Sequence, residues 1–167
     1  MTIQQSMAAV LQRELQAFER ELDLFPDDRS VWQTVPGVPN SAGNLALHVA
    51  GNLQFFVGRV LGGTSYVRDR DREFSTRSGS RADIVHELHN AAAAVRAVLP
   101  SLTSDELDGP FPEPVVAGRG IQTLTFLMHL CVHASFHLGQ AGYVRRAVTG
   151  RTESAGPVPL TILTHEL

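Results

Sequence analysis

Three histidines in a row are the residues of this sequence best suited to chemistry. His129, His133 and His137 are spaced four residues apart. On a helix each four-residue step turns the chain by about 400°, so the three side chains would stack on one face with a drift of about 40°. A chain with seven histidines in 167 residues carries such a triple by chance with a frequency on the order of 0.01. We therefore interpret the row as functional, because neighbouring imidazoles can share one metal ion.

His48 is a further histidine that could join this row from another helix. It lies one turn after Leu45 and one turn before Asn52, beside the apolar positions of a predicted helix. Ligands from separate helices that point into a bundle are a common form of metal site, and three imidazoles leave one coordination position for water or substrate. Spacing alone leaves open which two neighbours of the later row would join His48. The alternative is that all these histidines are hydrogen-bonded core residues.

The remaining histidines and the cysteine are not expected in such a site. Cys131 is the only cysteine, which excludes an intrachain disulfide and a cysteine-based zinc site. On a helical wheel it falls about 200° from His133, so we predict that it packs as a small core residue. His86 and His89 are expected on the surface of another predicted helix. His165 lies in a C-terminal tail, from residue 157 to 167, that we leave unassigned.

Other metal and catalytic chemistries find less support. A di-iron bundle needs inward Glu-x-x-His motifs on two helices, and the chain offers only Asp83-x-x-His86 on a face that should be solvated. The Cys-x-x-Cys-His motif of haem attachment is absent. No carboxylate stands out as a general base. Gln140 and Asn52, each one turn from a candidate ligand, are suited to orienting it, and their alternative role is that of a helix-packing amide.

Four amphipathic segments are predicted to position these side chains, since apolar residues recur in them at steps of three and four. Asn40 or Ser41 can cap the second helix, and Ser80 can cap the third. Pro26, Gly62 and Gly150 mark helix ends. The predicted helices cover about residues 3–25, 41–61, 81–102 and 120–148.

On the fourth predicted helix the apolar face is expected to point into the core. This face carries Thr125, Met128, Val132, Phe136 and Tyr143. With Ile121 at zero on the wheel it centres at about 20–40°, whereas the histidine row falls at about 80–160°. We therefore predict that the histidine row borders the core.

The fold class predicted from these segments is all-α, a four-helix bundle forming one domain over residues 1–167. Long loops are expected between the second and third helices and between the third and fourth. Residues 64–79 alternate arginines with acidic residues, which we interpret as an exposed connection, with a lid over a site as the alternative. Three prolines at positions 110, 112 and 114 exclude helix from the later loop.

Composition limits the partners of the chain. Fourteen Lys and Arg residues against seventeen Asp and Glu give a net charge of -3, and no basic run could neutralise a string of phosphates, so we expect no nucleic acid partner. No apolar stretch reaches the roughly 20 residues that span a bilayer, and the N-terminus has no signal-peptide core, so we expect no membrane partner and a cytoplasmic location. Gly51 and Gly58 could let a second copy approach closely, which predicts a homodimer; packing within the chain is the alternative.

The sequence resembles the DinB/YfiT-like superfamily of metalloenzymes in two motifs. The first is Trp32-x3-Pro36-x4-Ser41-x6-His48, and the second is His133-x3-His137-Leu138-Gly139-Gln140. The resemblance spans nearly the whole chain and implies a four-helix bundle with a three-histidine metal site near one end. It also implies His48, His133 and His137 as the ligands. His129 would then be an outer or surface residue.

Two functions are compatible with this site. The first is a metal-dependent enzyme, a thiol transferase or hydrolase, that uses one zinc or nickel ion. Relatives in the resembled family transfer or isomerise with low-molecular-weight thiols, so the resemblance implies such a thiol as one candidate for the unidentified small-molecule substrate. The second is a metal-stabilised structural or ligand-binding module without catalysis. An open coordination position facing a pocket would distinguish the enzyme from the structural module.

Overall fold

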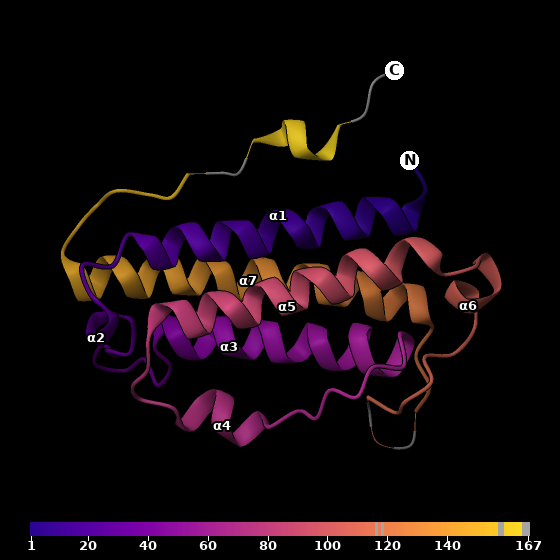
Figure 1. Cartoon of the computed structure of the whole chain (residues 1–167), viewed down its shortest axis with the longest axis horizontal. Coiled ribbons are helices and arrows are strands. Elements are labelled where there is room, and N and C mark those ends of the chain that lie inside the picture. The colour runs from indigo at the N-terminus through magenta and orange to yellow at the C-terminus, as the bar shows by residue number, and fades with distance from the viewer. Residues whose placement is uncertain (116, 118, 157–158, 165–167) are drawn as a thin grey trace.

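Four long helices make up most of the computed structural model, which describes residues 1–115, 117, 119–156 and 159–164 (Figure 1). No strand occurs in these ranges, so the prediction of an all-α fold is confirmed for them. The long helices are α1 (Ile3–Asp23), α3 (Ala42–Leu53), α5 (Arg81–Val98) and α7 (Thr123–Thr149), and α3 continues as the π-helix η1 (Gln54–Leu61). The short elements are α2 (Asp28–Val31), α4 (Arg70–Ser75), α6 (Ser104–Asp108) and the 3-10 turns η2 (Leu99–Ser101) and η3 (Leu160–Leu163).

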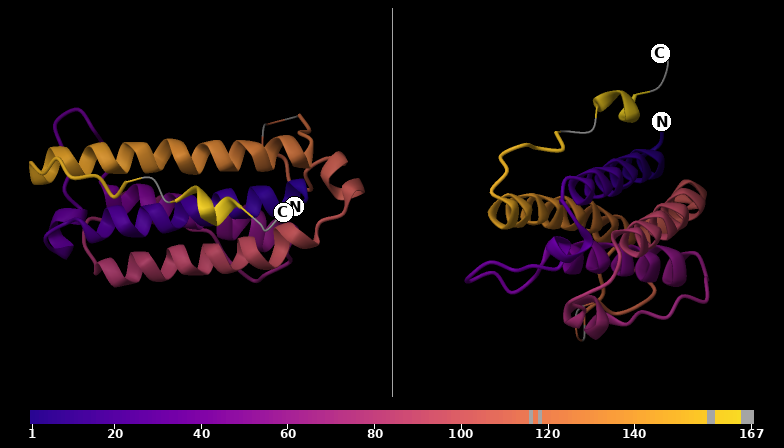
Figure 2. Two further views of the ribbon diagram at one scale, coloured as in Figure 1. Left: turned by 90° about the horizontal axis from the view of Figure 1, so that it is seen from above. Right: turned by 60° about the vertical axis from the view of Figure 1, so that its left-hand side comes forward.

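Each long helix packs against two other long helices. Helix α3 lies against α5 and α7, and α1 lies against the same two helices from the other side (Figures 1 and 2). Side chains from all four helices are almost fully buried in the space between them, among them Phe18, Leu53, Leu88 and Leu127. Burying each such side chain contributes about 1.5–3 kcal/mol to folding. This packing fixes α3 against α7, the two helices that carry the candidate site.

The helix ends lie where side-chain chemistry marks them. Ser41 caps α3 by accepting a hydrogen bond from the backbone N–H of Asn44, and the Asn44 Oδ1 accepts one from the Ser41 N–H. Ser80 caps α5 by accepting a hydrogen bond from the Asp83 N–H, without the second bond that completes a capping box. Gly150 ends α7 with a φ of 66°, which a residue without a Cβ adopts at little cost. These predicted boundaries are confirmed, whereas α7 begins at Thr123, three residues later than expected.

The prediction for the core face of α7 is wrong. The face expected in the core points outward, and Val132 and Tyr143 are 68% and 77% exposed. The same holds for Thr125, Met128 and Phe136. The buried face carries Phe126, Leu127, Leu130, Ala134, Ala141 and Val144. No Asp, Glu, Lys or Arg lies between residues 123 and 144, so both faces are uncharged and the pattern does not show which one is inside.

Residues 64–79 are not merely an exposed connection. Most of their side chains are exposed as predicted, but the segment forms α4, and Glu73 is buried against α3. Two anchors hold the segment in place. The Asn44 side chain donates to the backbone oxygens of Glu73 and Thr76 at 2.9 Å, and the Trp32 indole donates to the Gly79 oxygen at 2.8 Å. The segment is therefore fixed along α3 (Figure 1).

The chain after α7 returns along α1 (Figure 2). Arg145, fully buried, pairs with Glu21 at 2.6 Å and also donates to the Glu153 backbone oxygen. Ala155 donates its N–H to the same glutamate. Part of the tail left unassigned in the sequence analysis, including His165, lies outside the described residues. Among the residues described, no helix is both long and apolar enough to cross a membrane.

Candidate metal centre

Three histidines from two helices converge in the structure. His133 Nε2 lies 3.2 Å from His48 Nε2 and 3.1 Å from His137 Nε2, and one ligand atom from each ring lies within 4.8 Å of the others. Nitrogen atoms bound at about 2.0–2.1 Å to a tetrahedral metal are about 3.3–3.4 Å apart. The group could therefore hold a metal ion. His129 is exposed, with its ring centroid 5.6 Å from that of His133, and it is not part of the group.

A buried carboxylate fixes the orientation of His48. Glu73 Oε2 lies 2.9 Å from His48 Nδ1, and the same carboxylate accepts two bonds from Arg68, at 2.7 and 2.9 Å. Burial opposes ionisation of Glu73, but the bonds from Arg68 and His48 outweigh it and lower the pKa of the carboxyl. An ionised carboxylate only accepts hydrogen bonds. His48 therefore carries a proton on Nδ1, and the neutral form of this tautomer presents the lone pair of Nε2 to the other histidines.

His137 is held in the same tautomer from the other helix. Its Nδ1 lies 2.8 Å from Gln140 Oε1, an acceptor, so its proton is on Nδ1 and its Nε2 is also a lone pair. Burial lowers the pKa of His137, although the bond to Gln140 opposes the shift. Burial and the neighbouring histidines lower the pKa of His133 to about 3. The lowered pKa values keep His133 and His137 neutral at neutral pH, the form that binds metal ions, and a neutral His133 can donate to only one of its two neighbours.

Comparison with known proteins shows the family and the fold of this chain. The family model described as the DinB superfamily matches residues 11–141, a range that contains all three histidines. The chain belongs to the DinB superfamily. A conserved protein from Enterococcus faecalis has a crystal structure that aligns with a TM-score of 0.73, at 16% identity, over 90% of this chain and 99% of that one. This likeness concerns the fold alone. No curated protein matches the chain.

In this DinB chain a glycine makes room for the carboxylate. A Cβ placed on Gly51 would lie 2.3 Å from Glu73 Oε1 and 3.3 Å from the Tyr66 hydroxyl. At Gly58 a Cβ would meet Ala94 and Thr64 of the same chain. Both glycines therefore serve packing within the chain, the alternative named for them, and they give no support to a homodimer.

The sequence does not predict two residues of the centre, Glu73 and Arg68. Both lie in the segment interpreted as a connection, and the one signal that could have pointed to them is a glycine, Gly51, one turn after His48. The orienting role predicted for Gln140 agrees with its contact to His137. Asn52, proposed for the same role, forms no hydrogen bond through its buried Oδ1 in the described part of the chain.

Other side chains lie as the sequence indicates. Cys131 packs against the core near Met7, and burial raises the pKa of its thiol to about 11, so it is unreactive at neutral pH. His86 and His89 are exposed. These three residues take no part in the centre.

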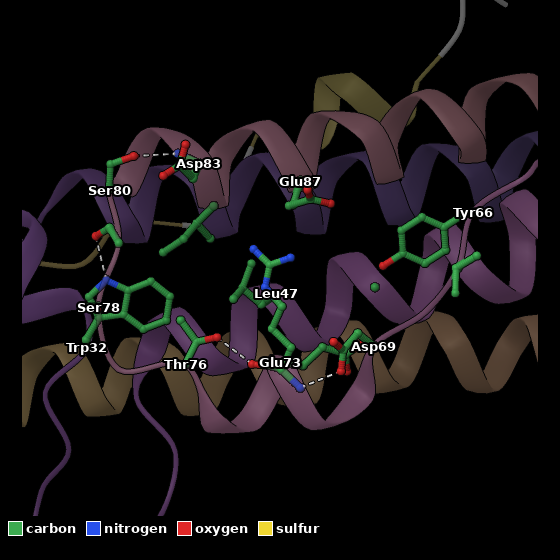
Figure 3. A pocket seen from close by; sticks show the side chains of 15 residues that line it. Trp32, Leu47, Tyr66, Asp69, Glu73, Thr76, Ser78, Ser80, Asp83 and Glu87 are labelled. Carbon is green, nitrogen blue, oxygen red and sulfur yellow. Dashed lines mark hydrogen bonds between the residues drawn. The ribbon is translucent and has the colours of Figure 1, made fainter.

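Two aromatic rings lie against the histidines, and a cavity lies on the other side of Glu73. The ring centroid of Phe74 lies 4.7 Å from that of His48, and the centroid of Phe136 lies 5.2 Å from that of His137. Glu73 also lines a polar cavity of about 280 Å³ between α4 and α5, with Tyr66 and Glu87 on its other walls (Figure 3). Glu73 thus links this cavity to His48.

Proposed function

We propose that this DinB-superfamily chain binds one divalent transition metal ion through the Nε2 atoms of His48, His133 and His137. The observation that carries the proposal is the convergence of three imidazole nitrogens, two of them on rings whose Nδ1 faces an acceptor, Glu73 for His48 and Gln140 for His137. A neutral His133 can donate to only one of its two neighbours, so a cation at the meeting point of the three nitrogens would satisfy the lone pairs that remain. Three imidazoles suit zinc or nickel. In this proposal the four long helices form one bundle domain.

The same proposal makes the protein a metal-dependent enzyme of the thiol-transferase or hydrolase type. A bound metal would supply Lewis acidity, which lowers the pKa of a coordinated water or thiol. His48 is buried, but His133 and His137 are only partly buried. A structural site is normally closed. Partial exposure therefore favours an enzyme over a structural module, with a low-molecular-weight thiol as the candidate substrate.

Zinc titration of four alanine variants tests the ligand set. His48→Ala, His133→Ala and His137→Ala should each bind zinc at least about 100-fold more weakly than wild type, because two imidazoles hold the ion less well than three. His129→Ala is the matched control from the same helix and should lose at most about tenfold, the lower limit for an outer residue. Wild-type affinity in His48→Ala would leave only a chelate on α7 and would refute the proposal.

Enzyme activity needs a separate assay. The zinc- and nickel-loaded protein is mixed with a low-molecular-weight thiol and 1-chloro-2,4-dinitrobenzene, and separately with nitrophenyl esters. Turnover that requires metal and is lost in His137→Ala supports an enzyme. A protein that binds metal tightly but turns over none of these substrates and loses only thermal stability when metal is removed supports the structural module.

We also propose a homodimer, formed by the exposed face of α7 rather than by the glycines of α3. Met128, Val132, Phe136 and Tyr143 are all more than half exposed on one face of α7, and the charged side chain on that face, Arg146, lies at its C-terminal end over the Tyr143 ring. Exposed apolar patches of this kind mark contact surfaces. Val132→Glu should give a monomer in sedimentation equilibrium, whereas Ala93→Glu, an exposed site on α5, should leave the dimer intact. A wild-type protein that is monomeric at all concentrations contradicts this proposal.

A further inference from the structure

An apolar cavity lies beside the histidine group, on the opposite side of α3 from the polar one. It measures about 650 Å³, is open to solvent, and is formed by residues 35–40, the start of α3 and the C-terminal half of α7. Val35, Val38, Leu45, Val144 and Ala147 line most of it. No charged side chain lines it; the polar groups are two amides and the Tyr143 hydroxyl. Sites for small organic molecules have this size and this mixture of apolar walls with few polar groups.

The cavity shares a wall with the candidate metal centre. Gln140 lines it and also accepts the hydrogen bond from His137 Nδ1 at 2.8 Å. On the other helix, Leu45 lines it one turn before His48. A molecule in the cavity would therefore touch the residue that orients His137.

The outer wall of the cavity is a hydrogen-bonded turn that contains two prolines. Pro36 and Pro39 have fixed φ angles, and Gly37 between them has a φ of 80°. The Val38 N–H donates to the Val35 oxygen at 3.0 Å and closes the turn. A preformed wall reduces the entropy that is lost when a ligand binds.

We infer that this cavity binds an uncharged, largely apolar small molecule, and that this molecule is the apolar part of the substrate of the centre. The second half of the inference rests on the proposed function, whereas the first does not. The class of ligand follows from the lining, since the walls are mostly apolar and offer a charged group no partner of opposite charge. The competing occupant is a second copy of the chain, because Tyr143 belongs both to the cavity and to the exposed face of α7.

N-phenyl-1-naphthylamine, a neutral apolar dye that fluoresces when it leaves water, tests the first half. We expect saturable binding of one dye per chain in the metal-free protein. Ala147→Leu fills part of the cavity and should weaken binding about tenfold or more. Ala93→Leu makes the same change at an exposed position of α5 and should bind as wild type. Both variants are checked for folding by circular dichroism.

Three results would overturn the binding site: no saturable binding, equal binding in the two variants, or a dye affinity that falls as the chain dimerises. The last would assign the cavity to a second copy. The link to the centre is tested in the cobalt(II) protein, whose visible absorption should change when the dye binds, because the dye perturbs Gln140 and hence His137. An unchanged spectrum would overturn the substrate assignment. A failure of metal binding leaves dye binding to the metal-free protein intact, so the two failures are distinguishable.

Discussion

Replacing Gly51 with alanine should weaken metal binding although this residue contacts no candidate ligand. The added Cβ would lie 2.3 Å from Glu73 Oε1 and 3.0 Å from its Cδ. Because carbon and oxygen atoms in ordinary contact are about 3.4 Å apart, the carboxylate must retreat by about 1 Å. Helix α3 is packed between α5 and α7, so the side chain rather than the helix backbone has to move.

The size of the effect follows from the bond that this movement breaks. Glu73 Oε2 lies 2.9 Å from His48 Nδ1, and a retreat of about 1 Å takes it beyond the usual limit of about 3.2 Å. Loss of such an outer partner costs about 10–100-fold in metal affinity. Alanine also favours the helix by about 1 kcal/mol over glycine. This gain offsets part of the strain, so Gly51→Ala should fold.

Competition between the protein and a chromophoric zinc chelator measures this change. Gly139→Ala on α7 is the matched control, because its Cβ would meet nothing within 4 Å. This variant should keep the wild-type zinc affinity and melt at a slightly higher temperature. Wild-type zinc affinity in Gly51→Ala would show that the Glu73 contact does not support His48, and the reasoning would be refuted.

Four further predictions follow from the same contacts. Glu73→Gln should lower zinc affinity about 10–100-fold in the same competition assay; unchanged affinity would contradict the role of the carboxylate. Burial holds the pKa of His133 at about 3 in the folded chain against 6.5 when exposed. As the pH falls, His133 is therefore protonated in the unfolded chain before it is protonated in the folded chain. Above pH 6.5 the metal-free protein has its full stability, and it should lose at most about 1.4 kcal/mol per pH unit from this group as the pH falls toward 3; partial exposure reduces the loss. Urea unfolding should show a flatter pH dependence in His133→Gln, and identical slopes would contradict it. Arg145→Met leaves Glu21 buried without its partner and should lower the free energy of unfolding by about 3–5 kcal/mol in urea, whereas a change below 1 kcal/mol would contradict a buried pair. Chelation of the metal should lower the stability by about 2.7 kcal/mol if free metal stood at about 100 times its Kd, and an unchanged melting temperature would argue against metal binding.

Helix positions were predictable where one residue type satisfies a specific backbone need. Ser41 and Ser80 accept backbone N–H groups that the first turn of a helix leaves free, and Gly150 adopts a positive φ that disfavours other residues. The histidine spacing likewise predicted that His133 and His137 would share a face. The choice of these two over His129 came from the family resemblance, because the spacing is the same for both pairs.

The rest of the centre depends on contacts that no local pattern records. Glu73 reaches His48 across 25 residues of sequence, from a segment without helical or strand period. The prediction of the buried face of α7 was wrong for a different reason. Its buried and exposed faces are both apolar, so hydrophobic periodicity identified the helix but not its orientation. Folding does not account for an outer face of α7 without charges between residues 123 and 144, whereas association of this face with a second copy of the chain would.

Anomalous diffraction from a zinc-loaded crystal, recorded on both sides of the zinc edge, is the most direct test of the proposed centre. We predict one strong peak per chain, about 2.0–2.1 Å from the Nε2 atoms of His48, His133 and His137. A peak held by His129 and His133 without His48, or no peak near any of these rings in a zinc-saturated crystal, would contradict the central claim.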